Sequence, residues 1–98
     1  MLPFGMTPDR TPELRQRLID AVALALTGDW QGAHLVAQDH DEDPIANWLH
    51  AVVHRMEGDE GNARYWYRRC RRELRPNVPT DEELREIQAA LAAEGGRA

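Results

Sequence analysis

The residues best suited to chemistry in this sequence are four histidines that lie close together in the chain. They are His34, His40, His50 and His54. His50 and His54 are four residues apart, so on a helix their side chains project from one face about one turn apart. Helical zinc ligands use this spacing, and Glu57 follows His54 closely enough to lie beside it. One hypothesis is therefore a divalent-metal or acid/base site, whose candidate residues are His34, His50, His54 and Glu57.

The histidine pair leaves both its third ligand and its chemistry open. The candidates for a third ligand are His34, Asp39, His40 and Asp41. The zincin pattern places a glutamate general base directly after the first histidine, but Ala51 occupies that position. Because no catalytic motif is complete, the sequence favours a non-enzymatic protein without a cofactor. A metal-dependent or acid/base enzyme is the alternative.

The same histidines can also have a purely structural role. Which role applies depends on which face of the helix expected over 44–57 is buried. The apolar residues of this segment follow the spacing of one helical face: Ile45, Trp48, Leu49, Val52, Val53 and Met56. If this stripe is the core of a five-helix bundle, His50 and His54 face solvent. If the register of a helical repeat applies, both are buried and bond to Asn62 or an arginine of the next helix. The stripe then lines a groove.

The elements that position these residues are all expected to be helices, because no segment has the alternation of a strand. Caps, first-turn prolines and glycine stops predict five helices, at about 12–27, 30–38, 44–57, 60–74 and 80–94. A chain of 98 residues forms one domain. We expect an irregular arm over 1–10 and a single all-α domain over 11–98. Its parts are a hairpin over 11–39, a second over 43–75 and a C-terminal helix over 80–94.

A shift of thirty residues aligns the two predicted hairpins. The matching small residues are Ala21, Gly28 and Ala33 in the first hairpin and Ala51, Gly58 and Ala63 in the second. The motif also includes Trp30, Tyr67 and Cys70. With these residues the region 14–76 resembles the tetratricopeptide repeat, and 63–70 is similar to the related Sel1 repeat. The segment 54–68 is also similar to a set of small helical proteins, which implies no function.

The tetratricopeptide resemblance implies two tandem helical hairpins, a C-terminal capping helix and a role in protein binding. Grooves of this family bind extended peptides. We therefore expect a small protein-interaction module, an adaptor or accessory subunit, with a homodimer as one form. The candidate partner-binding residues are Trp48, Arg55, Asn62, Tyr65, Arg68, Arg69 and Arg72.

The charge distribution narrows the classes of partner. A formal net charge of −5 disfavours a general nucleic-acid-binding protein. Residues 64–75 nevertheless contain six arginines and one glutamate, a surface that could bind an anion or nucleic-acid bases. No apolar stretch approaches the roughly 20 residues that span a bilayer, and no secretory signal pattern is present. We expect a cytoplasmic protein without a membrane partner.

Overall fold

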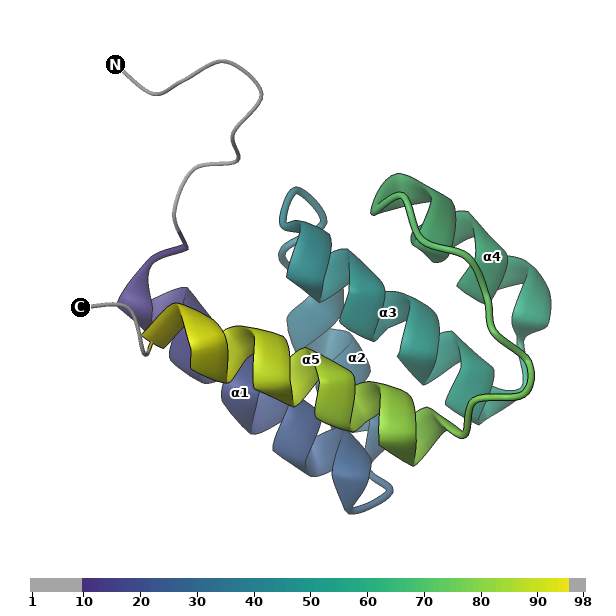
Figure 1. The fold of residues 1–98 in the computed structure, drawn as a ribbon, viewed down its shortest axis with the longest axis horizontal. Helices are drawn as coiled ribbons and strands as arrows, with labels where there is room; N and C mark the ends of the chain where they lie inside the picture. Colours follow the sequence, from purple (N-terminus) through teal and green to yellow (C-terminus); the bar gives the residue numbers. More distant parts are fainter. Residues whose placement is uncertain (1–9, 96–98) are drawn as a thin grey trace.

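The chain forms five α-helices in a computed structural model, which describes residues 10–95 (Figure 1). They are α1 (Pro12–Leu26), α2 (Trp30–Gln38), α3 (Pro44–Glu57), α4 (Glu60–Arg69) and α5 (Thr80–Gly95). No strand occurs in this range, so the prediction of an all-α fold with five helices is confirmed. The irregular arm predicted over 1–10 lies outside the described residues except for Arg10.

Side-chain caps explain where the first four helices begin. The capping residues are Thr11, Asp29, Asp43 and Asp59. At the start of α3, for example, Asp43 Oδ1 accepts a hydrogen bond from the backbone N–H of Ile45 at 2.8 Å. Such bonds satisfy backbone groups that have no partner inside the helix. These helix starts are therefore encoded locally, as the sequence predicted.

Two glycines form the tight turns between α1 and α2 and between α3 and α4. Gly28 has φ +97° and Gly58 has φ +87°, a left-handed conformation that favours glycine. A side chain at either position would be strained even though space is available. The turns make α1 with α2, and α3 with α4, into two helical hairpins.

The fourth helix is shorter than the sequence predicted. We expected it to continue to about residue 74, but α4 ends at Arg69. The chain turns away through Arg71, whose φ of 59° is left-handed, and Arg72 N–H donates to the Tyr67 carbonyl at 2.9 Å. Glycine usually occupies this position, so no ordinary stop signal marks this end. The arginine-rich segment 64–75 is consequently part helix and part loop.

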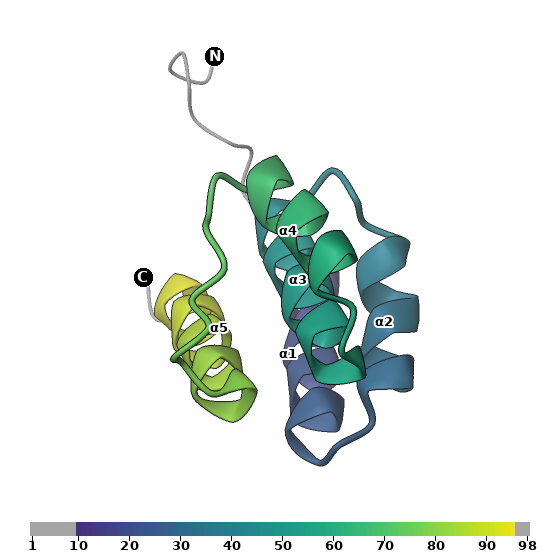
Figure 2. The ribbon, with the colours of Figure 1, turned by 90° about the vertical axis from the view of Figure 1, so that its right-hand side faces the viewer.

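The helices are arranged around α3, which contacts the other four. Figure 2 shows α5 on one side of α1 and α3, with α2 on the other side. Because α5 packs on both α1 and α3, it joins the two hairpins into one unit. Among the described residues, no helix has the length and apolar character needed to cross a membrane.

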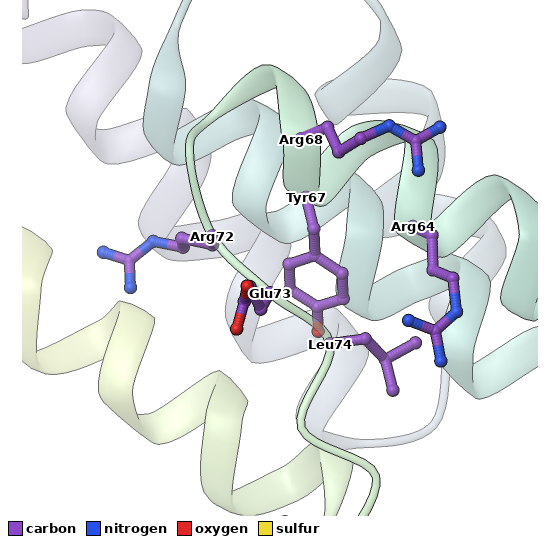
Figure 3. Close-up of a pocket in the computed structure, with 6 residues that line it drawn as sticks. All are labelled: Arg64, Tyr67, Arg68, Arg72, Glu73 and Leu74. Atoms are coloured by element: carbon purple, nitrogen blue, oxygen red, sulfur yellow. The ribbon is translucent and has the colours of Figure 1, made fainter.

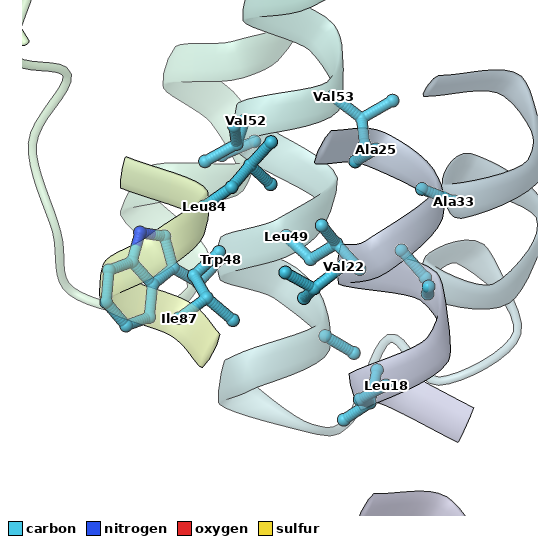
Figure 4. Close-up of a cluster of buried hydrophobic side chains, with 14 of the residues drawn as sticks. Leu18, Val22, Ala25, Ala33, Trp48, Leu49, Val52, Val53, Leu84 and Ile87 are labelled. Carbon is cyan, nitrogen blue, oxygen red and sulfur yellow. The ribbon is translucent and has the colours of Figure 1, made fainter. Parts of the chain in front are cut away.

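The apolar stripe of α3 lies in the centre of the core (Figure 4). Trp48, Leu49 and Val52 are 3%, 0% and 0% exposed. Leu84 and Ile87 of α5 lie beside Trp48, so α5 covers the face that would line a peptide groove in the repeat register. Burying each such side chain contributes roughly 1.5–3 kcal/mol. The stripe is therefore core, as one interpretation predicted. The same interpretation was wrong in placing His50 in solvent, because His50 is 3% exposed.

A buried carboxylate fastens α5 to α3 and α4. Glu83 is 1% exposed and accepts hydrogen bonds from Trp48 Nε1 at 2.8 Å and from the Tyr67 hydroxyl at 2.7 Å. Arg55 Nη1 donates to the same carboxylate at 2.6 Å, and its Nη2 donates to the Val78 carbonyl at 2.7 Å. Burial, followed by the hydrogen bond to Glu83, raises the pKa of Tyr67. The hydroxyl therefore remains a proton donor in this network.

We predict that Arg55→Met lowers the free energy of unfolding by about 3 kcal/mol, because it leaves the buried Glu83 without its closest positive partner. Urea denaturation measures this change. Arg85→Met is the matched control, because Arg85 makes an exposed pair with Asp81 at 3.3 Å. Its loss should cost less than about 0.5 kcal/mol. Equal losses in the two variants would show that the Glu83 network stabilises no more than a surface ion pair.

Candidate metal centre

Three of the four histidines converge between α2 and α3. His34 lies on α2, and His50 and His54 lie on α3. The Nε2 atoms of His34 and His50 are 3.0 Å apart. One ring nitrogen from each of the three residues lies within 4.8 Å of the others. The histidines therefore form a cluster of possible metal ligands, here called the histidine cluster (His34, His50, His54).

Helix packing brings these side chains together. The four-residue spacing places His50 and His54 on one face of α3. Ala33 and Ala37 of α2 are fully buried, and these small side chains allow α2 to approach α3 closely. His34 follows Ala33 directly and thereby reaches His50 across the helix contact. Within the cluster, His50 is 3% exposed, whereas His34 and His54 are half-buried.

An aromatic side chain of α4 covers the inner member of the cluster. The Trp66 ring stacks on His50 with ring centroids 3.8 Å apart and planes 14° apart. The Arg69 guanidinium lies over the Trp66 ring, 5.2 Å from its centroid. His50 is thus enclosed by α2, α3 and α4, which excludes water from its ring.

This burial favours the neutral forms of His34 and His50. Burial, with smaller effects from His34 and His54, lowers the pKa of His50 to about 3. Burial and the neighbouring His54 also lower the pKa of His34 below its ordinary value. Neutral imidazole is the form that binds metal ions.

The hydrogen bonds assign the proton on His50. Its Nδ1 is buried and has no hydrogen-bond partner. A neutral imidazole carries one N–H, so the favoured tautomer has the proton on Nε2, which donates to Nε2 of His34. His34 then carries its own proton on Nδ1.

A carboxylate orients the outer histidine. His54 Nδ1 and Glu57 Oε1 are 2.7 Å apart, so this nitrogen donates to the carboxylate and Nε2 is the nitrogen left to bind a metal ion. Carboxylates that hold the second nitrogen of a ligating histidine fix its tautomer and strengthen it as a ligand. Asp59 lies near His54 and Glu57, but its carboxylate accepts a hydrogen bond from Asn62 Nδ2 at 2.6 Å.

The structure selects among the ligand candidates. His34 joins the two helical histidines, whereas Asp39, His40 and Asp41 do not belong to the cluster. Asn62, which one interpretation placed against His50 or His54, bonds instead to Asp59. Trp66 is the α4 residue that contacts His50. The helical spacing of Trp66 from Ala63 and Cys70 indicates the inner face of α4, but nothing in the sequence indicates its contact with a histidine.

The candidate partner-binding residues do not form one surface. Trp48 is buried and Arg55 is bound to Glu83. The remaining five are exposed: Asn62, Tyr65, Arg68, Arg69 and Arg72. Several of these also have contacts within the chain: Asn62 bonds to Asp59, Arg69 donates to the Asp41 carbonyl at 3.1 Å, and Arg72 lies 3.4 Å over the Trp48 ring.

We predict that the free energy of unfolding decreases as the pH is lowered from about 6.5 towards 5. The pKa values of His34 and His50 are lowered in the folded chain, so the unfolded chain binds more protons over this range. The contribution of His50 approaches about 1.4 kcal/mol per pH unit and continues until the pH nears its folded value, about 3. Urea denaturation at a series of pH values measures the slope.

His50→Phe is the comparison for this prediction, because phenylalanine keeps an aromatic ring beside Trp66 and removes the titrating group. Its unfolding free energy should depend less steeply on pH between about 5 and 6.5. Parallel curves for the two proteins would contradict a lowered pKa for His50.

Comparisons with known proteins do not suggest a function, so a functional assignment depends on the geometry of the histidine cluster. No protein-family model, no curated protein and no solved structure matches the chain.

Proposed function

We propose that this protein binds one divalent transition-metal ion through His34, His50 and His54. The observation that carries the proposal is the convergence of three imidazole nitrogens from two helices within 4.8 Å of one another. Imidazole is a ligand for zinc, copper, iron and nickel, and zinc is the ion we expect first.

The spacing of the nitrogens suits a tetrahedral ion. Zinc–nitrogen bonds of about 2.0–2.1 Å place two ligand nitrogens about 3.3 Å apart. The Nε2 atoms of His34 and His50 are 3.0 Å apart, so a small separation of the two rings creates the required geometry. His54 is close enough to supply the third nitrogen after a side-chain adjustment.

The surroundings of the cluster favour a bound cation in two ways. Burial lowers the pKa values of His34 and His50, which favours the neutral form of imidazole that binds metal ions. Glu57 adds a negative charge beside His54, 2.7 Å from its Nδ1. A cation at the cluster therefore meets imidazole nitrogens and a nearby carboxylate, and His50 becomes a ligand once its proton leaves Nε2.

Three protein ligands leave one position of a tetrahedral ion for a small molecule. Catalytic zinc sites keep such a position, whereas structural sites fill all four with protein ligands. His34 and His54 are half-buried rather than enclosed, so a small ligand can reach this position from solvent. Glu57 is hydrogen-bonded to His54. We therefore assign to Glu57 the role of orienting the His54 ring, not that of a metal ligand.

One feature of His50 limits the affinity. Binding through Nε2 moves the imidazole proton to Nδ1, which has no acceptor nearby. An unsatisfied buried donor costs about 1–3 kcal/mol. We therefore expect moderate affinity rather than the very tight binding of a structural zinc site.

We predict that the purified protein binds one zinc or nickel ion and that a chelator lowers its melting temperature, because an ion that binds only the folded chain stabilises it. Calorimetric titration gives the stoichiometry. Tryptophan fluorescence gives a second signal, since Trp66 stacks on the ligand His50. His34→Gln and His50→Ala should each abolish binding.

Two further variants distinguish a specific metal site from unspecific binding of metal ions by histidines. His40→Gln should bind the ion normally, because His40 lies outside the cluster. Glu57→Gln should weaken binding by about 10–100-fold, as expected for the loss of an orienting carboxylate. If the native protein binds no ion, or if His40→Gln and His34→Gln bind equally well, the proposal fails.

A second proposal is a protein-interaction module of the tetratricopeptide type. It is supported by the shared construction of the two hairpins: Gly28 and Gly58 are both left-handed, and Ala33 and Ala63 are both fully buried. Because α5 covers α1 and α3, a partner would bind an outer face. Leu35 of α2, which is 60% exposed, is available there.

Self-association is the form of this proposal that can be measured directly. Sedimentation at increasing protein concentration should reveal a dimer, and Leu35→Glu should weaken it about tenfold if one leucine is buried at the interface. Gln38→Glu adds a similar charge at another exposed position of α2 and serves as the control. A protein that stays monomeric throughout would contradict the homodimer.

A further inference from the structure

The helix α2 buries little apolar surface against the rest of the molecule. Of its nine residues only Ala33 and Ala37 are fully buried, and both have small side chains. Trp30 and Val36 are half-buried against the core. In the part of the chain that the structure describes, α2 contacts α1 and α3 and no other helix. Because stabilisation by burial scales with the apolar area removed from water, these contacts hold α2 only weakly.

Polar contacts add little to the attachment of α2, which has no charged side chain. Among the described residues, the bond between Nε2 of His34 and Nε2 of His50 at 3.0 Å is the only side-chain hydrogen bond from α2 to another helix. By contrast, α4 is held by the Tyr67 hydroxyl, which donates to Glu83 of α5 at 2.7 Å. Figure 3 shows the Tyr67 side chain extending from α4. The helix α2 therefore lies outside the network that fastens α3, α4 and α5 together.

The local sequence of α2 also gives the helix little stability of its own. Isolated helices shorter than about 12–15 residues are marginal in water, and α2 has nine residues. Gly32, a residue type with low helix propensity, lies in its first turn. The cap at Asp29, whose Oδ1 accepts a hydrogen bond from Gly32 N–H at 2.9 Å, opposes this effect. Elements with few buried apolar contacts are those that open locally while the rest of a protein stays folded.

We propose that the ion bound by the histidine cluster cross-links α2 to α3, and that α2 opens locally when the ion is absent. This inference rests on the metal binding proposed above. His34 is the single ligand from α2, whereas His50 and His54 both come from α3. When α2 opens, His34 leaves the ion and two ligands remain. The ion therefore favours the closed form, by the difference between its affinity for three ligands and its affinity for two.

Control of α2 changes one face of the molecule and leaves the opposite one intact. Figure 2 shows α2 on the side of α1 and α3 that lies away from α5. Leu35, which is 60% exposed, belongs to the outer face of α2 only while α2 is helical. The ion thereby regulates this face without altering the contacts that Glu83 makes on the other side.

Hydrogen exchange of the full chain at about pH 7 tests the proposal, without zinc and with free zinc at about 100 times its dissociation constant. Without zinc, amide protons of α2 should exchange at least about tenfold faster than those of α3, with rates that change little in low concentrations of urea. The rates in α3 should rise steeply with urea, because they require global unfolding. With zinc, exchange in α2 should slow about 100-fold.

His34→Gln and His40→Gln are matched variants, because each replaces one histidine by glutamine and only His34 belongs to the cluster. Zinc should leave exchange in α2 unchanged within about twofold in His34→Gln, and should slow it about 100-fold in His40→Gln. If metal-free α2 shows the exchange rates and urea dependence of α3, or if bound zinc leaves α2 exchanging rapidly, the cross-link is refuted even though calorimetry detects zinc binding. A native chain that binds no zinc overturns both this inference and the proposed metal binding.

Discussion

The buried carboxylate of Glu83 connects three helices, and the arrangement of the fold depends on it. It receives the indole N–H of Trp48 from α3, the hydroxyl of Tyr67 from α4 and the guanidinium of Arg55. These donors would be buried or half-buried without an acceptor if α5 moved away, at a cost of about 1–3 kcal/mol for each lost partner. These polar groups therefore fix the position of α5 relative to α3 and α4, and with it the apolar contacts that α5 makes. Because α5 stays in place, the inner face of α1 and α3 is closed, and α2 and α4 carry the surfaces on which a ligand can bind.

Two polar clusters lie on different faces of α3, and they differ in how well they are satisfied. Around Glu83 every described donor has an acceptor and the charges of Arg55 and Glu83 balance. Around His50 there is no comparable balance, since its Nδ1 has no partner and its pKa is lowered by burial and by the neighbouring histidines. Evolved cores rarely retain such groups unless they stabilise the fold or bind something. The Glu83 network is a satisfied contact among α3, α4 and α5. The histidine cluster keeps an unpartnered nitrogen where α2 meets α3, so it is the better candidate for a ligand site.

Most of the helices could be predicted from the sequence because their boundaries are set by local chemistry, such as the Asp43 cap and the left-handed Gly58. The end of α4 could not, because Arg71 adopts a conformation that normally indicates glycine. The spacing of His50 and His54 was visible in the sequence, but the arrival of His34 depends on the packing of α2 against α3. Likewise, the sequence predicted a helix over 80–94, whereas the burial of Glu83 depends on the position of α5 across α3. Glu83 lies four residues before Ile87 on the same helical face. This spacing is the one signal in the sequence that could have indicated the burial of Glu83.

The central position of α3 has a consequence for how the molecule opens. In an open array of helical hairpins each unit contacts only its neighbours, so ends can fray while the middle stays folded. Here α3 contacts all four other helices, and α5 bridges α1 and α3. Neither hairpin keeps a complete core when the other is lost, so the chain should unfold cooperatively. Amide protons of α3 should then exchange with solvent only through global unfolding, at a rate that reports the stability of the whole molecule.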